Sequence, residues 1–149
     1  MQTKIYTKYQ SLVKMKRKDE NVFRGDNILH YHFGIIGCQH GHIATFIKQM
    51  QALGHHCVGI YDPGDTAMAE KISKRLGVPL IDDKRELLAP SVQLIGSSAI
   101  NNEKIDIIEE CERYGKHVML DKPVVTNSAD LQRFEQVLKR GKIKVGVMF

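Results

Sequence analysis

The segment His32–Gly37, with the sequence HFGIIG, and the turn Cys38–His42 that follows it decide the fold. A short apolar run that ends in glycine is typical of a parallel strand buried on both faces. Behind the turn, apolar residues recur at helical spacing from Ile43 to Leu53, and Gly54 closes the pattern. These residues therefore predict a strand, a tight turn and a helix, the first unit of an α/β domain.

The same alternation of apolar runs and amphipathic segments continues along the chain. Further strands are expected over residues 57–61, 79–81, 92–96, 117–120 and 144–149, and helical segments over 66–76, 85–88, 103–114 and 128–139. Because parallel strands need helical crossovers, this order predicts a single-domain α/β fold with a doubly wound, mainly parallel, Rossmann-like sheet.

The last helix carries the most specific local expectations. Ser128 is expected to cap its amino terminus, and Leu131, Phe134 and Leu138 are expected to form its apolar face.

Positive charge is concentrated at the amino-terminal end of the chain. Residues 1–30 hold seven Lys/Arg and three Asp/Glu, whereas the rest of the chain holds fifteen and fourteen. This distribution predicts a basic, mobile extension over residues 1–30 and a nearly neutral domain over 31–149. A nucleic-acid-binding protein usually spreads positive charge over a folded face, so we expect no nucleic-acid partner.

Other composition features indicate a cytoplasmic protein without a membrane partner. No apolar run approaches the roughly 20 residues needed to cross a bilayer, and the amino terminus lacks the apolar stretch of a secretory signal. Cys38, Cys57 and Cys111 form no C-x-x-C pair, and an odd number of cysteines cannot all pair within one chain. Reduced thiols are therefore expected.

The turn after the first strand is a candidate phosphate site. In doubly wound folds, ligands bind beyond the carboxyl ends of the strands, and pyrophosphate meets bare amides at a helix amino terminus. Compared with G-x-G-x-x-G, Gly37 is in register, Gln39 and His42 occupy the second and third glycine positions, and Gly41 is displaced by one. The turn is thus either a degraded dinucleotide motif or simply a tight turn of an α/β domain.

Asp62 follows the second predicted strand, 20 residues after His42. A carboxylate at this place can accept both ribose hydroxyls of an adenosine. It would repel a 2′-phosphate, and no arginine follows, so NAD is favoured and NADP is less expected. Alternatively, Asp62 only opens the Asp62–Gly64 turn.

The same turn after the first strand is also a candidate metal site. Cys38, His40 and His42, with His30 and His32 upstream, could supply ligands, but their spacing matches no standard site. Alternating ligands on a turn rarely converge, so no metal is expected.

Lys122 is the candidate catalytic residue. It directly follows an apolar strand and precedes Pro123, which biases it away from helical geometry and keeps it at the sheet edge. A partly desolvated lysine beside a cationic nicotinamide could exchange protons near neutrality. The alternative is an ordinary Asp-Lys pair that opens a loop.

The segment Gly115–Val124, GKHVMLDKPV, resembles the A-G-K-H-V-x-x-E-K-P signature of the glucose–fructose oxidoreductase, inositol dehydrogenase and MocA (Gfo/Idh/MocA) family. Gly34–Gly37, Asp62 and the helix before Gly115 also lie where that family has their equivalents. The resemblance covers residues 31–149, the family's amino-terminal Rossmann domain. It implies an NAD(P)-dependent dehydrogenase of sugars and cyclic polyols, in which Lys122 contacts the reacting hydroxyl and the nicotinamide ribose.

The resemblance and the strand-end positions together predict a cofactor-binding set. The turn residues would line the pyrophosphate, Asp62 the adenosine ribose, and the residues after the fourth strand the nicotinamide pocket. The set comprises Gly37, Cys38, Gln39, His40, Gly41, His42, Asp62, Ser97, Ser98, Asn101, Asp121 and Lys122.

The sequence departs from the family pattern at three further places. Asp121 replaces the usual glutamate, and the usual T-P-x-x-x-H reads A-I-N-N-E-K over residues 99–104, without its proline and histidine. The family's α+β substrate domain would begin after Phe149 and is absent from this sequence.

We therefore expect a dinucleotide-binding domain that is inactive alone and needs a second domain to take a sugar or polyol. The uncovered sheet edge predicts a homo-oligomer. The alternative is a non-catalytic module that senses a nucleotide or binds a partner protein.

Overall fold

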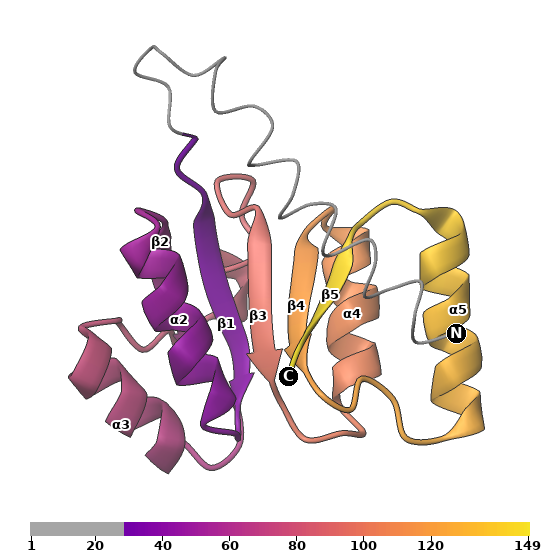
Figure 1. Ribbon diagram of the computed structural model, residues 1–149, viewed down its shortest axis with the longest axis horizontal. Coiled ribbons are helices and arrows are strands. Elements are labelled where there is room, and N and C mark those ends of the chain that lie inside the picture. The colour runs from indigo at the N-terminus through magenta and orange to yellow at the C-terminus, as the bar shows by residue number, and fades with distance from the viewer. Residues whose placement is uncertain (1–28) are drawn as a thin grey trace.

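The computed structural model describes residues 29–149. The expected extension over residues 1–30 lies almost entirely outside this range. The described chain folds around a five-stranded, all-parallel sheet with the strand order β2-β1-β3-β4-β5 (Figure 1). The strands are β1 (His32–Cys38), β2 (His56–Tyr61), β3 (Leu94–Ser98), β4 (His117–Asp121) and β5 (Val145–Met148).

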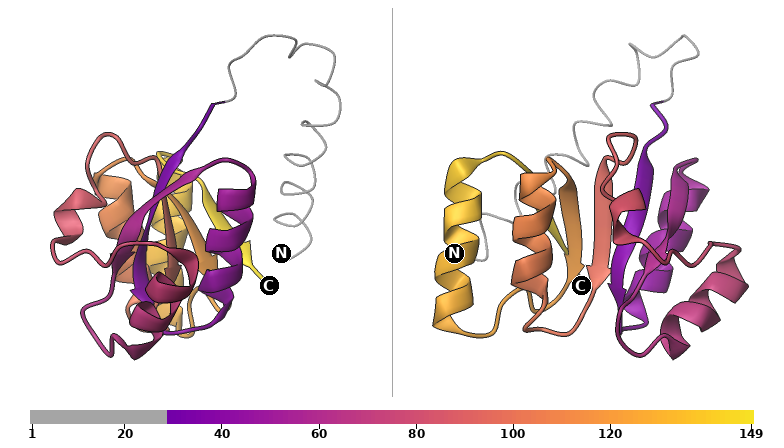
Figure 2. Two further views of the ribbon diagram at one scale, coloured as in Figure 1. Left: turned by 90° about the vertical axis from the view of Figure 1, so that its left-hand side faces the viewer. Right: turned by 180° about the vertical axis from the view of Figure 1, so that it is seen from behind.

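Helices cover both faces of the sheet, as Figures 1 and 2 show. The core on one face contains residues of α2 and α3, and the core on the other contains residues of α4 and α5. No helix in residues 29–149 has both the length and the apolar character that crossing a bilayer requires. The helices are α2 (His42–Ala52), α3 (Ala67–Leu76), α4 (Lys104–Arg113) and α5 (Ser128–Arg140), with a short 3-10 helix, η1 (Lys84–Glu86).

The doubly wound arrangement explains why the strands are apolar throughout. Side chains of neighbouring residues on a strand point to opposite faces, and here both faces are covered. Ile35 packs in the core of α2 and α3, whereas Ile36 packs in the core of α4 and α5. The predicted α/β fold with a doubly wound parallel sheet is therefore confirmed.

The third predicted strand, over residues 79–81, is reduced to an isolated bridge between Leu80 and Ile60. The Ile60 amide donates to Pro79 O, and the Ile81 amide donates to Ile60 O. Pro79 has no amide hydrogen, so the segment cannot extend its ladder in the amino-terminal direction. The expectation of six strands was wrong by this one. If the bridge is counted as a strand, the order is 3-2-1-4-5-6, that of a Rossmann fold.

The cap of α5 differs from the sequence prediction. Asn127, not Ser128, is the capping residue, and its side chain accepts a hydrogen bond of 2.8 Å from the Asp130 amide. Asn127 has an extended backbone, which aims its side chain at the third amide of the helix.

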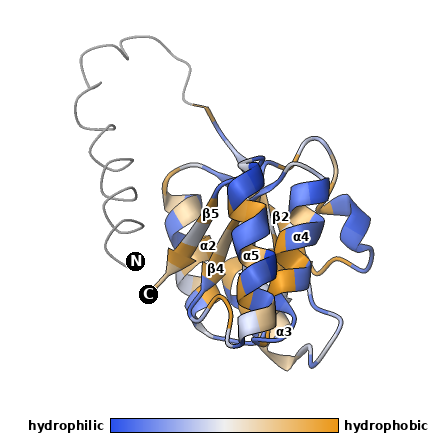
Figure 3. Cartoon of the chain, turned by 90° about the vertical axis from the view of Figure 1, so that its right-hand side faces the viewer, coloured by the Kyte–Doolittle hydropathy of each residue, from blue (hydrophilic) through white to orange (hydrophobic). Residues whose placement is uncertain are grey.

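The apolar face of α5 agrees with the prediction only in part. Phe134 is half-buried and packs against the core, as predicted, but Leu131 and Leu138 are 44% and 46% exposed. On the side of α5 turned to the viewer in Figure 3, hydrophilic and hydrophobic stretches alternate. Val137, which was not predicted, is completely buried, because the crossing of α5 over the sheet points this position inward.

Val137 and Leu138 therefore provide a test of which side of α5 is buried. We expect Val137→Ala to lower the free energy of unfolding by about 2 kcal/mol, since it removes two buried methyl groups and leaves a cavity. Leu138→Ala, its neighbour, should change it by less than about 0.5 kcal/mol. Urea denaturation of both variants measures the difference, and equal losses would contradict the observed orientation of the helix.

Candidate functional site

A cavity of about 310 Å³ lies at the carboxyl ends of the strands, where three loops meet. Its walls come from the β1–α2 turn, the β3–α4 loop and the residues after β4. Half of the predicted cofactor-binding residues line it. They are Gln39, His40, Ser98, Asn101, Asp121 and Lys122.

Gly37 lies beneath the turn and lets it approach the β3–α4 loop. Its φ is +82°, and a Cβ atom built on it would lie 2.5 Å from Ala99 Cβ and 3.0 Å from Ala99 Cα. Only glycine combines this conformation with such a close approach. The first glycine of the motif is therefore required for packing of the turn.

The fold already uses the first three amides of the turn. Cys38 N donates to Asp62 Oδ2 (2.8 Å), Gln39 N to Ser98 O (3.0 Å) and His40 N to Ser98 Oγ (3.3 Å). Within residues 29–149 the amides of Gly41 and His42, at the start of α2, have no acceptor. An anion at this helix end would therefore meet these two amides rather than the whole turn.

Asp62 is half-buried and has three donors around its carboxylate. Besides the Cys38 amide, Gln39 Nε2 donates to Oδ2 (2.6 Å) and Gly64 N donates to Oδ1 (3.0 Å). The last bond makes Asp62 the opener of the Asp62–Gly64 turn, one of the two roles expected from the sequence. The bond from Gln39 joins the degraded position of the glycine motif to the predicted ribose carboxylate.

Two of the predicted residues have buried side chains that do not line the cavity. Ser97 Oγ accepts from the Ala99 amide (3.2 Å) and supports the β3–α4 loop. The Cys38 side chain packs in the core of α2 and α3. Burial, together with the nearby charge of Asp62, raises the pKa of the Cys38 thiol to about 12, so it stays protonated near neutrality. Only the backbone of Cys38 contributes to the site.

Lys104 is a residue of the site that sequence reasoning did not select. It is the first residue of α4, is 1% exposed and lines the cavity. Its Nζ lies 2.6 Å from Asp121 Oδ1. The same oxygen accepts no hydrogen bond of good angle, so the contact is an ion pair. The family's T-P-x-x-x-H pattern could have indicated Lys104, because this lysine occupies the position of the histidine.

Lys122 lies at the end of β4 and is exposed on the cavity. Its backbone amide donates to Met148 O (3.3 Å), which ties the segment to β5. The predicted catalytic residue thus has a held backbone and a side chain that is free to meet a ligand.

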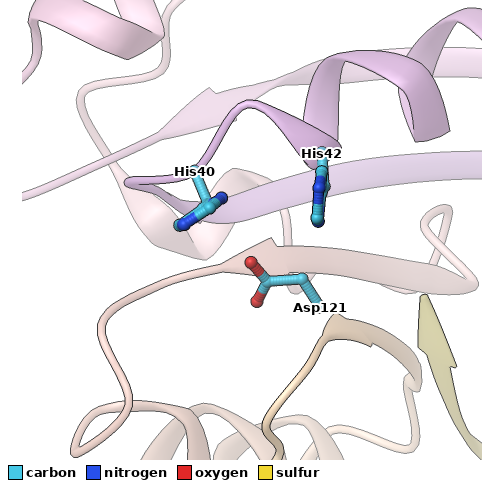
Figure 4. A group of neighbouring side chains, drawn as sticks. All are labelled: His40, His42 and Asp121. Carbon is cyan, nitrogen blue, oxygen red and sulfur yellow. The ribbon is translucent and has the colours of Figure 1, made fainter. Parts of the chain in front are cut away.

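The side chains of His40, His42 and Asp121 lie close together beside the cavity, as Figure 4 shows. One potential ligand atom from each lies within 4.8 Å of the others. The structure thus brings together side chains that the sequence did not predict to converge. However, Lys104 neutralises Asp121, and the amino terminus of α2 carries a partial positive charge. The surrounding charge therefore favours an anion over a cation between these residues.

A family model described as "Oxidoreductase family, NAD-binding Rossmann fold" matches residues 31–149. The chain belongs to the Gfo/Idh/MocA oxidoreductase family. The resemblance seen in Gly115–Val124 is confirmed, and the described domain is the family's NAD-binding Rossmann domain. No curated protein gives a significant match to the chain.

Solved structures agree with this fold. UDP-N-acetylglucosamine 3-dehydrogenase from Acidithiobacillus ferrooxidans superposes with a TM-score of 0.65 at 18% identity, covering 80% of this chain and 38% of its own. An NAD-binding protein from Listeria innocua gives 0.65 at 22% identity (78% and 34% covered). Biliverdin reductase from Synechocystis sp. PCC 6803, solved with biliverdin and NADP+, gives 0.62 at 20% identity (78% and 37% covered). The chain thus spans about a third of the length of these solved structures.

The two glycines of the turn allow a matched test of its packing. We expect Gly37→Ala to lower the free energy of unfolding by at least about 2 kcal/mol, because the new methyl group meets Ala99 and the backbone is left-handed. Gly41→Ala has open space around its Cβ position and a helical φ of −65°, so about 0.5 kcal/mol or less is expected. Thermal or urea unfolding measures both. A Gly37→Ala protein as stable as Gly41→Ala would show that the turn does not pack as described.

Proposed function

We propose that this domain binds NAD across the carboxyl ends of β1, β2, β3 and β4, as the nucleotide-binding half of a dehydrogenase acting on a sugar or polyol hydroxyl. The observation that carries the proposal is the placement of Asp62 directly against the β1–α2 turn, through the Cys38 amide. In a Rossmann domain these two elements hold the adenosine ribose and the pyrophosphate of one dinucleotide.

The charge around the turn supports binding of the pyrophosphate. The unpaired amides of Gly41 and His42 lie at the positive end of α2, and the exposed imidazoles of His40 and His42 flank them. Lys122 adds a positive charge at the wall of the cavity. An anion there would meet donors from three sides.

The adenosine end supports NAD rather than NADP. Asp62 would place its negative charge beside the ribose, where a 2′-phosphate would be repelled. Pro63, Gly64 and Asp65 follow it, so the turn itself supplies no cation to offset that repulsion. One of the similar solved structures holds NADP+, so similarity of fold alone does not decide between the two cofactors.

The chemistry would use Lys122. When NAD is bound, its nicotinamide accepts a hydride from the carbon that carries the substrate hydroxyl. The proton of that hydroxyl would pass to Lys122, which lines the same cavity. Lys122 would have to be uncharged at that step, because an ammonium has no lone pair to accept a proton. Because substrate positioning accounts for many orders of magnitude of rate, we expect the 149-residue chain alone to bind NAD without turnover.

The exposed edge of the sheet supports self-association of the domain. β5 is an edge strand of the sheet, and Phe149, which follows it, is 83% exposed. Exposed strand edges and apolar side chains recruit partners, a second copy of this chain among them.

Cofactor choice tests the proposed function directly. We expect isothermal titration calorimetry to show saturable binding of NAD and weaker binding of NADP. Asp62→Asn should weaken NAD binding by about 1–3 kcal/mol, through loss of charge-assisted bonds to the ribose, and should reduce the preference over NADP. Asp82→Asn removes the same charge from an exposed position away from the cavity and should leave both affinities unchanged. Equal affinity of the unsubstituted chain for NAD and NADP would contradict the role of Asp62.

Gln39 provides a second test, because its side-chain amide donates to the Asp62 carboxylate, which the ribose hydroxyls would need as their acceptor. We expect Gln39→Gly to leave NAD affinity unchanged or to increase it, since Asp62 Oδ2 loses one of its two donors and the turn amides become more accessible. Calorimetric titration of Gln39→Gly and Gln39→Ala would separate loss of the side chain from added backbone freedom. A loss of about tenfold or more in both variants, about 1.4 kcal/mol, would show that Gln39 itself contacts the nucleotide.

A further inference from the structure

The side chain of Lys104 reaches from the start of α4 to the end of β4. Its Nζ donates to Asp121 O (3.1 Å) and Pro123 O (3.0 Å), and it lies 2.6 Å from the Asp121 carboxylate. Asn101 Oδ1, at 3.4 Å, completes its surroundings. One side chain therefore contacts the residues on both sides of Lys122.

The segment around Lys122 is held at three points by these contacts. Lys104 binds the carbonyl groups before and after Lys122, and the Lys122 amide donates to Met148 O. The side chain of Lys122 is exposed on the cavity. The position from which Lys122 reaches into the cavity thus depends on a buried neighbour rather than on contacts of its own side chain.

We propose that Lys104 is a positioning residue of the dinucleotide site, which holds the Asp121–Pro123 segment so that Lys122 projects into the cavity. The inference rests on the proposed function, because Lys122 matters only if a ligand meets it there. Lys104 itself is 1% exposed, its ammonium is bonded to Asp121, Pro123 and Asn101, and it acts through the backbone around Lys122.

An ammonium suits this task better than an apolar side chain of equal length. It offers three donors, which here bond two carbonyl oxygens and Asn101 Oδ1, and its charge pairs with the Asp121 carboxylate. An apolar replacement would leave those groups without partners, and a buried carboxylate without a counter-charge is strongly unfavourable. The cost of burying the charge of Lys104 is therefore offset by its ion pair and its hydrogen bonds. These same contacts hold the segment that carries Lys122.

Lys116 makes the same kind of contact away from the site. It is 5% exposed, and its Nζ donates to Ala89 O and Val92 O, both at 2.7 Å. Neither it nor its two partners line the cavity. Lys116 is thus a matched control for loss of a buried lysine that bridges two carbonyl groups.

The test uses the 149-residue chain, with Asp121→Asn as the background so that no unpaired carboxylate is left in the core. Lys104→Met is added to this background, and Lys116→Met is made separately. Amide hydrogen exchange of Lys122 reports the order of its segment, exchange of Ile35 in β1 reports the fold as a whole, and titration with NADH reports the site.

Relative to Asp121→Asn, we expect Lys104→Met to accelerate exchange of the Lys122 amide about tenfold, with Ile35 unchanged. NADH affinity should fall about tenfold, because a small displacement of Lys122 would weaken its contact with the bound nucleotide. Lys116→Met should accelerate amide exchange at both Ile35 and Lys122 or at neither, and NADH affinity should be unchanged. Unchanged exchange at Lys122, or equal acceleration at Ile35, would overturn the inference.

The failure of the proposed function would look different. If the unsubstituted chain does not bind NADH, the dinucleotide proposal is wrong, and the positioning role toward it is wrong with it. If NADH binds equally well to Asp121→Asn and to the double variant while Lys122 exchanges faster, Lys104 orders the segment without serving the site, and the inference alone is overturned.

Discussion

The lack of space between Gly37 and Ala99 is the constraint on which the site depends. The β1–α2 turn and the β3–α4 loop approach so closely that no Cβ atom fits between them. Their contact places Ser98 where it accepts from the His40 amide and donates to the His40 carbonyl. It also sets the end of β1 beside Asp62, across the parallel pairing of β1 and β2. The turn, the strand-end carboxylate and the cavity are consequences of this one approach.

Much of the fold could be predicted from the sequence, because the sheet is buried on both faces and its strands are apolar throughout. The β1–α2 unit and the helix ending before Gly115 agree with prediction to within a residue or two. The segment around Leu80 could not be classified correctly, because a bridge and a short strand have the same three-residue pattern. The inward side of α5 depends on how the helix crosses the sheet, so periodicity alone favoured Leu138 over Val137.

The site was predictable in its location and less so in its contacts. Strand ends indicated where Asp62, Ser98 and Lys122 lie, because parallel strands bring their carboxyl ends to one edge. Sequence alone could not show that Gln39 binds Asp62, because that bond joins residues 23 positions apart across two strands. Nor could it show that Lys104 is buried. A lysine at the start of a helix usually points to solvent, and only the fold shows that this one points inward.

Ile35 and Ile36 are adjacent in the chain but belong to different cores. The sheet thus divides the interior into two compartments, each filled by its own pair of helices. Cys38 and Ile43, on either side of the glycine turn, belong to the compartment of α2 and α3. Ala99, against which Gly37 packs, belongs to the compartment of α4 and α5. The turn therefore lies where the two compartments meet, and a change of side-chain volume in either of them reaches it.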